Sequence, residues 1–225
     1  MNKYSPVLLL LGISLAYCAA ELGRAWLILL WLAVDFLVVG FAYALREPRV
    51  LGKRLDGTLP VWSWILFLPY HALNLAVWHS SRLLSSEPAT NEIGGLLVVG
   101  RRLLDSEMVN GCENWVDLTS EFQEPLRIRS QSGYICFPIL DATAPDLERL
   151  SDLVRRLPPG RTFIHCAQGH GRTGMVALAL LLSRDAAESI AAALGQIQDA
   201  RPAVRLNSEQ HRCAVAYGAL LGKGA

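Results

Sequence analysis

The hydrophobic positions of the chain divide it into two parts. Three long apolar segments lie within the first 80 residues, at about 6–20, 25–45 and 59–78. The second is long enough to cross a membrane as a helix, and the first is short for a span. The third is also long enough, but it contains Pro69, His71 and Asn74. We therefore expect residues 1–80 to form a membrane region of two or three hydrophobic helices.

Two interpretations of the first segment remain open. Residues 6–20 could be a signal peptide, because small residues follow at its end. Because residues 25–45 follow almost at once, we favour a tight hairpin of two retained helices. Asp35 lies inside the second segment, where a carboxylate is a functional candidate, although pairing with a helix neighbour or a residue at the lipid interface is the preferred interpretation. The aromatic residues of segment 59–78 suit a membrane interface, so it either spans or lies along the surface.

The second part has the pattern of a globular α/β domain. Residues 81–90 are rich in Ser and Pro and are interpreted as a linker, and residues 91–225 are the domain. Short apolar runs predict strands at 93–102, 115–119, 133–138 and 163–165, and helical spacing predicts helices at 146–157, 186–200 and 208–221. This alternation predicts a central, mostly parallel sheet flanked by helices.

The stretch from Thr162 to Gly174, TFIHCAQGHGRTG, carries the candidate chemistry. A short strand leads into a glycine-rich loop, and an apolar helix is predicted to begin near Thr173. Glycines let successive backbone N–H groups converge on one anion, and the N-terminus of the helix adds positive potential. Arg172 can hold two phosphate oxygens with its planar guanidinium. The same field favours the thiolate of Cys166, which predicts a nucleophile in a phosphate-binding loop.

This Cys-x5-Arg-Thr stretch closely resembles the active-site loop of the cysteine-dependent protein tyrosine and dual-specificity phosphatases. The resemblance covers roughly residues 91–221 and implies their fold, with no cofactor. It also implies that Thr173 stabilises the leaving thiolate, a role compatible with capping the helix, and that His165 orients Cys166, unless His165 is a core histidine. The phosphate-binding positions implied are Ala167, Gln168, Gly169, His170, Gly171 and Arg172.

A general acid is expected beside the loop, because the leaving oxygen needs a proton. Asp141 follows a predicted strand and stands 25 residues before Cys166, close to where the family has its acid. Asp146 is the alternative, although its place after Pro145 suits the start of a helix. Asp117 lies inside an apolar strand and is interpreted as structural.

Other polar residues are assigned supporting roles. Asn207 and Gln210 either line the pocket or, as we favour, cap the last helix. Cys112, Cys136 and Cys213 are expected to be buried, although one could trap oxidised Cys166 as a disulfide. The spacing of Cys and His predicts no metal site. The net charge of +1 gives no electrostatic reason to expect nucleic acid as a partner.

Together these patterns predict a membrane-anchored cysteine phosphatase. The expected substrate is protein phosphotyrosine, with phosphoserine and phosphothreonine as extensions, and a phospholipid such as phosphatidylglycerophosphate or a phosphoinositide is the alternative. A non-catalytic phosphate-binding membrane adaptor is a third interpretation. Four basic residues in segment 46–54 place that segment in the cytoplasm. If segment 59–78 does not span, the catalytic domain lies on the cytoplasmic face, where a reactive thiol is also better preserved.

Overall fold

The computed structural model describes residues 4–22 and 26–223, which form two compact units. The helical unit comprises the described residues up to 54 together with 58–84 and 120–123. The α/β unit comprises residues 55–57, 85–119 and 124 onwards. The boundary at 84/85 falls inside the predicted linker. Residue 25, the first of the predicted second segment, lies outside the described residues.

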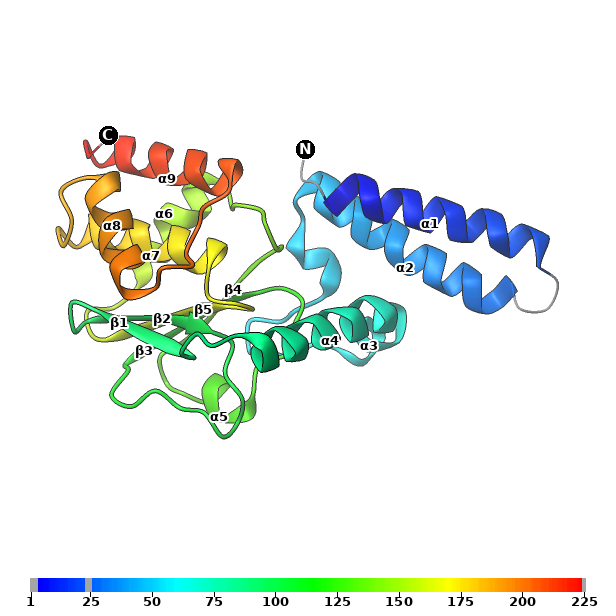
Figure 1. Ribbon diagram of the computed structural model, residues 1–225, viewed down its shortest axis with the longest axis horizontal. Coiled ribbons are helices and arrows are strands. Elements are labelled where there is room, and N and C mark those ends of the chain that lie inside the picture. Colours follow the sequence, from blue (N-terminus) through cyan, green and yellow to red (C-terminus); the bar gives the residue numbers. More distant parts are fainter. Residues whose placement is uncertain (1–3, 23–25, 224–225) are drawn as a thin grey trace. The chain divides into compact units, whose positions relative to one another are not determined.

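Two apolar helices begin the helical unit and pack side by side as an antiparallel hairpin (Figure 1). They are α1 (Tyr4–Glu21) and α2 (Trp26–Leu45). Their close approach depends on two glycines. A Cβ on Gly12 would lie 2.6 Å from the side chain of Leu37, and one on Gly40 would lie 2.9 Å from that of Leu9. Small residues at such crossings let the two backbones approach closely, so van der Waals contacts can hold helices together even where lipid removes the hydrophobic driving force. The predicted hairpin is therefore present.

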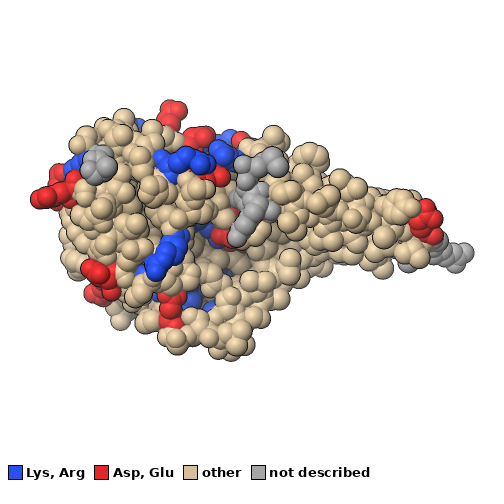
Figure 2. All heavy atoms as spheres, turned by 45° about the horizontal axis from the view of Figure 1, so that its top comes forward, with Lys and Arg blue, Asp and Glu red and all other residues tan. Residues whose placement is uncertain are grey.

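By length and composition, α1 and α2 are the two helices within the described residues that could cross a membrane. Large apolar side chains such as Leu10, Ile13 and Ile28 are more than half exposed on them. In Figure 2 the visible side of the hairpin carries charged atoms only near its end. This surface is uncharged over nearly its whole length, as expected for helices that face lipid.

The third apolar segment, predicted at about 59–78 and interrupted by Pro69, His71 and Asn74, forms two helices. A short 3₁₀ helix, η2 (Pro48–Leu51), is followed by α3 (Val61–Leu66) and α4 (Leu68–Leu84). The chain bends at Phe67, because Pro69 has no N–H to donate to the carbonyl four residues earlier, that of Ile65, and its ring crowds that carbonyl. α4 then continues into the predicted linker as far as Leu84.

Asp35 explains how α4 begins. The first turn of α4 contains Pro69, which has no N–H, and the N–H of Tyr70 donates to Asp35 Oδ2 at 2.9 Å. Asp35 is fully buried in α2. A carboxylate that accepts an otherwise unbonded N–H at a helix start acts as a cap supplied from another helix. The expected pairing with a neighbouring helix is confirmed.

The α/β unit contains a five-stranded sheet in the order β1-β2-β5-β3-β4. All neighbouring pairs are parallel except β1 and β2. The predicted strand at 93–102 is wrong in its first half, because Gly94 and Gly95 adopt positive φ and turn the chain between β1 and β2. The strands are β1 (Thr90–Ile93), β2 (Leu97–Arg101), β3 (Asn114–Thr119), β4 (Tyr134–Ile139) and β5 (Thr162–Cys166).

Four helices cover one face of this sheet, and a short helix lies on the other (Figure 1). The four are α6 (Leu147–Arg156), α7 (Gly171–Ser183), α8 (Ile190–Ala200) and α9 (Ser208–Leu220), and the short one is α5 (Leu126–Arg129). α8 begins four residues later than predicted, because the side chain of Ser189 accepts the N–H of Ala192 and caps the helix there. The predicted mostly parallel α/β sheet is confirmed.

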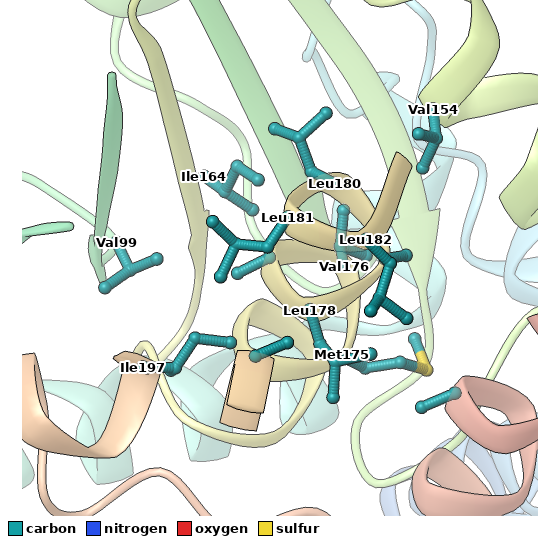
Figure 3. Close-up of a cluster of buried hydrophobic side chains, with 14 of the residues drawn as sticks. Val99, Val154, Ile164, Met175, Val176, Leu178, Leu180, Leu181, Leu182 and Ile197 are labelled. Atoms are coloured by element: carbon teal, nitrogen blue, oxygen red, sulfur yellow. The ribbon is translucent and has the colours of Figure 1, made fainter. Parts of the chain in front are cut away.

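The main core of the α/β unit surrounds α7. Every residue of α7 from Arg172 to Leu182 is buried. Figure 3 shows Val176, Leu178 and Leu181 of this helix among Val99, Ile164 and Ile197. A helix that is apolar on all sides needs such burial. The core therefore fixes the N-terminus of α7 against the end of β5, where the glycine-rich loop lies.

Candidate active site

The two residues of the signature, Cys166 and Arg172, lie at the two ends of the loop between β5 and α7. Cys166 is the last residue of β5, and α7 begins at Gly171, two residues before the predicted start. Arg172 and Thr173 therefore lie in the first helical turn, both buried. The N-cap residue is His170, so the expected capping role of Thr173 is wrong. Thr173 Oγ1 forms no hydrogen bond within the described part of the chain, which leaves it available to a partner in the loop.

The loop turns its carbonyl groups outward. Ala167 O accepts from Arg102 N, and His170 O accepts from Gly174 N. Gln168 O and Gly169 O both accept from the side chain of Arg201, at 3.0 Å each. In a trans peptide the C=O and the following N–H point in opposite directions. Four consecutive N–H groups, from Gln168 to Gly171, are thus directed inward, as an anion-binding loop requires.

Two contacts explain why the loop needs glycine. Gly169 has φ +75°, and a Cβ there would collide with the backbone of Gly100 and lie 2.6 Å from Arg101 N. A Cβ on Gly171 would lie 2.6 Å from Gln210 Oε1. The N–H of Gly169 reaches the sulfur of Cys166 at 3.3 Å. One loop amide therefore already reaches the thiol, and its dipole favours the thiolate.

Arg172 and Asp141 are brought together at the mouth of the loop. Arg172 Nη1 donates to Ile139 O at 2.8 Å, and Arg172 Nη2 lies 3.2 Å from Asp141 Oδ1. The guanidinium is buried, with 1% of its side chain exposed, whereas the Asp141 side chain is 48% exposed. The buried guanidinium of Arg172 is therefore in contact with the partly exposed carboxylate of Asp141, which solvent and ligands can reach.

The segment that carries Asp141 is held by the start of α9. Asn207 Nδ2 donates to Ala142 O at 2.9 Å, and Gln210 Nε2 donates to Thr143 O at 3.3 Å. The same two side chains form a reciprocal capping box at the N-terminus of α9. The favoured capping role is therefore confirmed. Gln210 also packs against Gly171, so one residue connects the phosphate loop to the Asp141 segment.

The other two aspartates have different surroundings. Asp146 is the N-cap residue of α6, and its exposed side chain forms no capping hydrogen bond. Asp117 is fully buried and accepts from Thr119 N at 2.8 Å and from the hydroxyl of Tyr134 at 2.8 Å. This bonding agrees with the structural role expected for Asp117. Burial and the carboxylate of Asp117 raise the pKa of Tyr134 far above its usual range, so its hydroxyl remains a donor.

His165 lies on the opposite face of the sheet from Cys166, because successive strand residues alternate. Its ring stacks on Phe163 with centroids 5.2 Å apart. Nε2 lies 3.6 Å from Glu124 Oε1 and 4.0 Å from Asp117 Oδ1, and all three side chains are fully buried. His165 therefore has no direct path to the sulfur through its ring, and the expected orienting role would act through the strand backbone.

The remaining loop positions do not form a row of cations. Ala167 has no polar side chain, and Gln168 is half-buried. The Nε2 of His170 lies 2.7 Å from Glu87 Oε2, so its ring is turned toward the segment before β1. Neither Glu87 nor Arg201 was predicted to belong to the site. Arg201 directly follows the predicted helix at 186–200, and no sequence pattern shows that its side chain returns to a loop 32 residues earlier.

The other cysteines of the α/β unit have environments that disfavour ionisation. Burial, with the carboxylates of Asp146 and Glu209, raises the pKa of Cys213 to about 11. Burial also raises the pKa of Cys112, with Arg161 acting in the opposite direction. Cys136 is buried, as expected, whereas Cys112 and Cys213 are half-buried.

Comparisons with known proteins agree with this geometry. No protein-family model matches the chain. The curated "Putative tyrosine phosphatase 197R" of Invertebrate iridescent virus 6 is 33% identical over 87 residues, which is 33% of this chain and 33% of the viral protein. The match thus spans about a third of the viral protein's length.

Solved structures resemble the α/β unit over most of their own length. Tk-PTP in the active form has a TM-score of 0.50 and 26% identity and covers 56% of this chain and 93% of its own. Human DUSP28 has a TM-score of 0.51 and 18% identity, covering 60% and 97%. PTPMT1 in complex with PI(5)P has a TM-score of 0.53 and 12% identity, also covering 60% and 97%. The last two likenesses establish a common fold.

Proposed function

We propose that this chain, whose fold and loop are those of the protein tyrosine and dual-specificity phosphatases, is a membrane-tethered phosphatase that hydrolyses protein phosphotyrosine through a phosphocysteine intermediate. The observation that carries the proposal is the assembly of Cys166, four inward loop amides, Arg172 and Asp141 around one position. A binding module would need the amides and the arginine, but it would not need a thiol at the centre of the loop.

In the first chemical step, Cys166 Sγ attacks phosphorus and the bond from phosphorus to the ester oxygen breaks. The charge on the three other phosphate oxygens is met by the loop amides and Arg172. Asp141, as the carboxylic acid, gives its proton to the leaving oxygen. The contact of Asp141 with Arg172 supports this role, because it keeps the carboxyl group beside the guanidinium that binds the phosphate.

In the second step, water attacks the phosphocysteine, and the bond from phosphorus to sulfur breaks. Asp141, now a carboxylate, takes a proton from the water, and the thiolate of Cys166 leaves with a hydrogen bond from Gly169 N–H. The buried hydroxyl of Thr173 is the further donor we assign to the leaving thiolate. The two steps together convert a phosphomonoester and water into an alcohol and inorganic phosphate.

The charges of the loop support a substrate with one phosphate group. Arg172 is the loop's single arginine, and positions 167 and 168 are Ala and Gln. His170, which could have faced a second phosphate, is paired with Glu87. A phosphotyrosine side chain needs no more than this. The named relative, a viral tyrosine phosphatase by its description, supports the same class.

A singly phosphorylated phospholipid is the second candidate. It is favoured by the two apolar helices, because tethering at a bilayer raises the local concentration of lipid headgroups. PTPMT1, which shares the fold, has been crystallised with PI(5)P. The loop has Ala167, Gln168 and His170 and no lysine. This composition argues against a polyphosphorylated inositol ring as substrate.

We further propose that α1 and α2 span the membrane and that the catalytic unit lies on the cytoplasmic face. The bend at Phe67 divides the third segment into helices of 6 and 17 residues: the first is too short to span, and the second, at the lower limit of length, carries His71, Asn74 and Arg82. Exposed Trp62 and Ile65 instead suit an interfacial position. With two spans, the basic segment after α2 and the catalytic unit lie on the same side, and the positive-inside rule makes that side the cytoplasm.

The test is phosphate release by full-length protein in lipid vesicles, with a phosphotyrosine peptide, a phosphothreonine peptide and phosphatidylglycerophosphate as substrates. Cys166→Ser is the blank, because it removes the nucleophile and retains the amides and Arg172. We expect turnover of the phosphotyrosine peptide. A preference for the lipid would establish the second candidate. Substrate binding without turnover of any of the three would leave the phosphate-binding adaptor as the function.

Orientation is tested in vesicles of known sidedness. Inside-out membrane vesicles should hydrolyse a water-soluble aryl phosphate without detergent, whereas right-side-out vesicles should do so only after permeabilisation. The opposite pattern would place the catalytic unit outside and require a third span.

A further inference from the structure

One arginine outside the signature is bonded to the phosphate loop more extensively than any other side chain of the described α/β unit. Arg201 is the C-cap residue of α8, and 1% of it is exposed. Its guanidinium uses all five N–H groups. Nε donates to Gly169 O, and Nη2 donates to Gln168 O and to Glu87 Oε2. Nη1 donates to Pro88 O and to Asn91 Oδ1.

Two of these bonds set the direction of the loop amides. The carbonyls of Gln168 and Gly169 belong to the peptide planes that carry the N–H groups of Gly169 and His170. Because C=O and N–H are antiparallel in a trans peptide, an arginine that holds both carbonyls outward turns both N–H groups inward. The bond from Gly169 N to Cys166 Sγ is the observed result. Arg201 therefore orients the two middle peptides of the loop from the side opposite Cys166.

The other three bonds attach Arg201 to Glu87 and Pro88, in the segment before β1, and to Asn91 in β1 itself. Glu87 Oε2 accepts a hydrogen bond from Arg201 Nη2 at 3.2 Å and lies 2.7 Å from His170 Nε2. One carboxylate oxygen thus connects the arginine behind the loop with a side chain of the loop itself. Burial lowers the pKa of Arg201, while the charges of Glu87 and Cys166 raise it.

We propose that Arg201, fixed by Glu87, is a positioning residue that holds the phosphate loop in its anion-binding conformation and supports the thiolate of Cys166. This inference rests on the loop being the phosphate site of the proposed function. It assigns to Arg201 an effect on phosphate affinity and on thiolate reactivity, and no contact with substrate. It also gives the segment 85–89, which leads from the helical unit into the catalytic unit, a direct bond to the catalytic loop.

Lysine cannot replace this arginine. A lysine ammonium has three donors on a single nitrogen and cannot reproduce a planar fork with five. In Arg201→Lys at least one of the two loop carbonyls loses its partner, and the corresponding N–H is free to turn away from the anion. One hydrogen bond to a charged group is worth about 1.5–3 kcal/mol, which corresponds to a loss of affinity of about tenfold to hundredfold.

The matched control is Arg184→Lys. Arg184 also donates to two backbone carbonyls of the α/β unit, those of Pro158 and Gly160, and neither belongs to the loop. Burial lowers its pKa as it does for Arg201. A general loss of stability from breaking two guanidinium–carbonyl bonds is therefore present in both variants, and an effect on the loop is expected in only one.

The experiment measures three quantities in full-length wild type and variants: the melting temperature, the inhibition constant of orthovanadate, and the pH dependence of alkylation of Cys166 by iodoacetate. Vanadate affinity should fall about tenfold or more in Arg201→Lys, and its alkylation profile should move to higher pH. Arg184→Lys should match wild type in both. Glu87→Gln should change both in the direction of Arg201→Lys, by a smaller amount.

Two results would overturn the proposal. One is a folded Arg201→Lys with the vanadate affinity and alkylation profile of Arg184→Lys. The other, decisive if Arg201→Lys does not fold, is a folded Glu87→Gln with wild-type values of both. Alkylation needs no substrate, so it tests the role of Arg201 even if no phosphoester in the substrate panel is hydrolysed, whereas failure of the whole panel counts against the proposed function alone.

Discussion

Arg172 Nη2 lies 3.2 Å from Asp141 Oδ1, so the cation proposed to bind phosphate and the carboxyl group proposed to supply a proton are in contact. The contact selects Asp141 over Asp146, whose exposed side chain is at the start of α6 and forms no capping hydrogen bond. A bound phosphate would accept two hydrogen bonds from the guanidinium of Arg172, and the carboxyl group of Asp141 would then be beside the ester oxygen. Asp141 is thereby positioned as the general acid.

Asp141→Asn should lower kcat by about 10²–10⁴, the usual contribution of general acid catalysis. The loss should be largest for alkyl phosphates, whose leaving oxygen needs the proton most, and smallest for aryl phosphates with good leaving groups. Steady-state kinetics on a series of leaving groups measures it. Asp146→Asn is the matched control, and its activity should equal wild type. A loss of activity in Asp146→Asn with none in Asp141→Asn would reverse the assignment.

Gly169→Ala should abolish most activity and destabilise the α/β unit. The methyl group would meet the backbone of Gly100 and Arg101, which cannot move aside as a side chain could, and the residue has φ +75°. Left-handed geometry for a non-glycine residue costs roughly 1–2 kcal/mol before any clash is counted. Thermal or urea unfolding, together with turnover of an aryl phosphate, measures both effects.

Gly195→Ala gives the opposite expectation and serves as the control. Gly195 lies inside α8, and a Cβ there would meet no atom within 4 Å. Alanine in a helix interior is favoured over glycine by about 0.5–1 kcal/mol. The variant should therefore be as active as wild type and slightly more stable. Equal effects of the two substitutions would contradict the geometry described for the loop.

The sequence was sufficient to predict the chemistry, because the nucleophile and the cation lie six positions apart on one continuous segment. Strand, loop and helix are each determined by local pattern: Phe163 and Ile164 favour a strand, Gly169 a turn, and residues 175–182 a buried helix. Asp141 was also predictable, since it follows a strand whose parallel neighbours end at the same edge of the sheet.

The residues that hold the loop from behind could not be predicted in this way. Glu87 and Arg201 are 114 positions apart, and each resembles an ordinary polar residue of a linker or turn. Pro69 indicated an interruption of the third apolar segment, but the position of the break at Phe67 could not be predicted, because hydrophobicity continues through it. Long-range hydrogen bonds and single-proline bends leave little trace in hydrophobic periodicity.

The thiols of the chain should differ in reactivity. At pH 8, where a thiol with a pKa of about 11 is almost wholly protonated, Cys213 should resist alkylation, and it should react as the pH is raised toward 11. Cys166, whose sulfur accepts an N–H, should react first with iodoacetate and be protected by vanadate. Mass spectrometry of labelled peptides measures each site, with Cys213→Ala identifying its peptide. Labelling of Cys213 at pH 8 at the rate of a small free thiol would contradict its burial.

Asp35→Ala should loosen the helical unit and leave the catalytic step unchanged. Asp35 accepts the N–H of Tyr70, and loss of a capping acceptor costs about 0.5–2 kcal/mol. Asp35→Asn, which retains a side-chain oxygen at the same place, should keep most of that stability. Limited proteolysis in lipid vesicles should therefore cut Asp35→Ala faster than wild type within α3 and α4, with Asp35→Asn close to wild type. If instead Asp35→Asn lost phosphatase activity at unchanged protease resistance, the carboxylate would have a functional role within the membrane region rather than the structural one assigned to it.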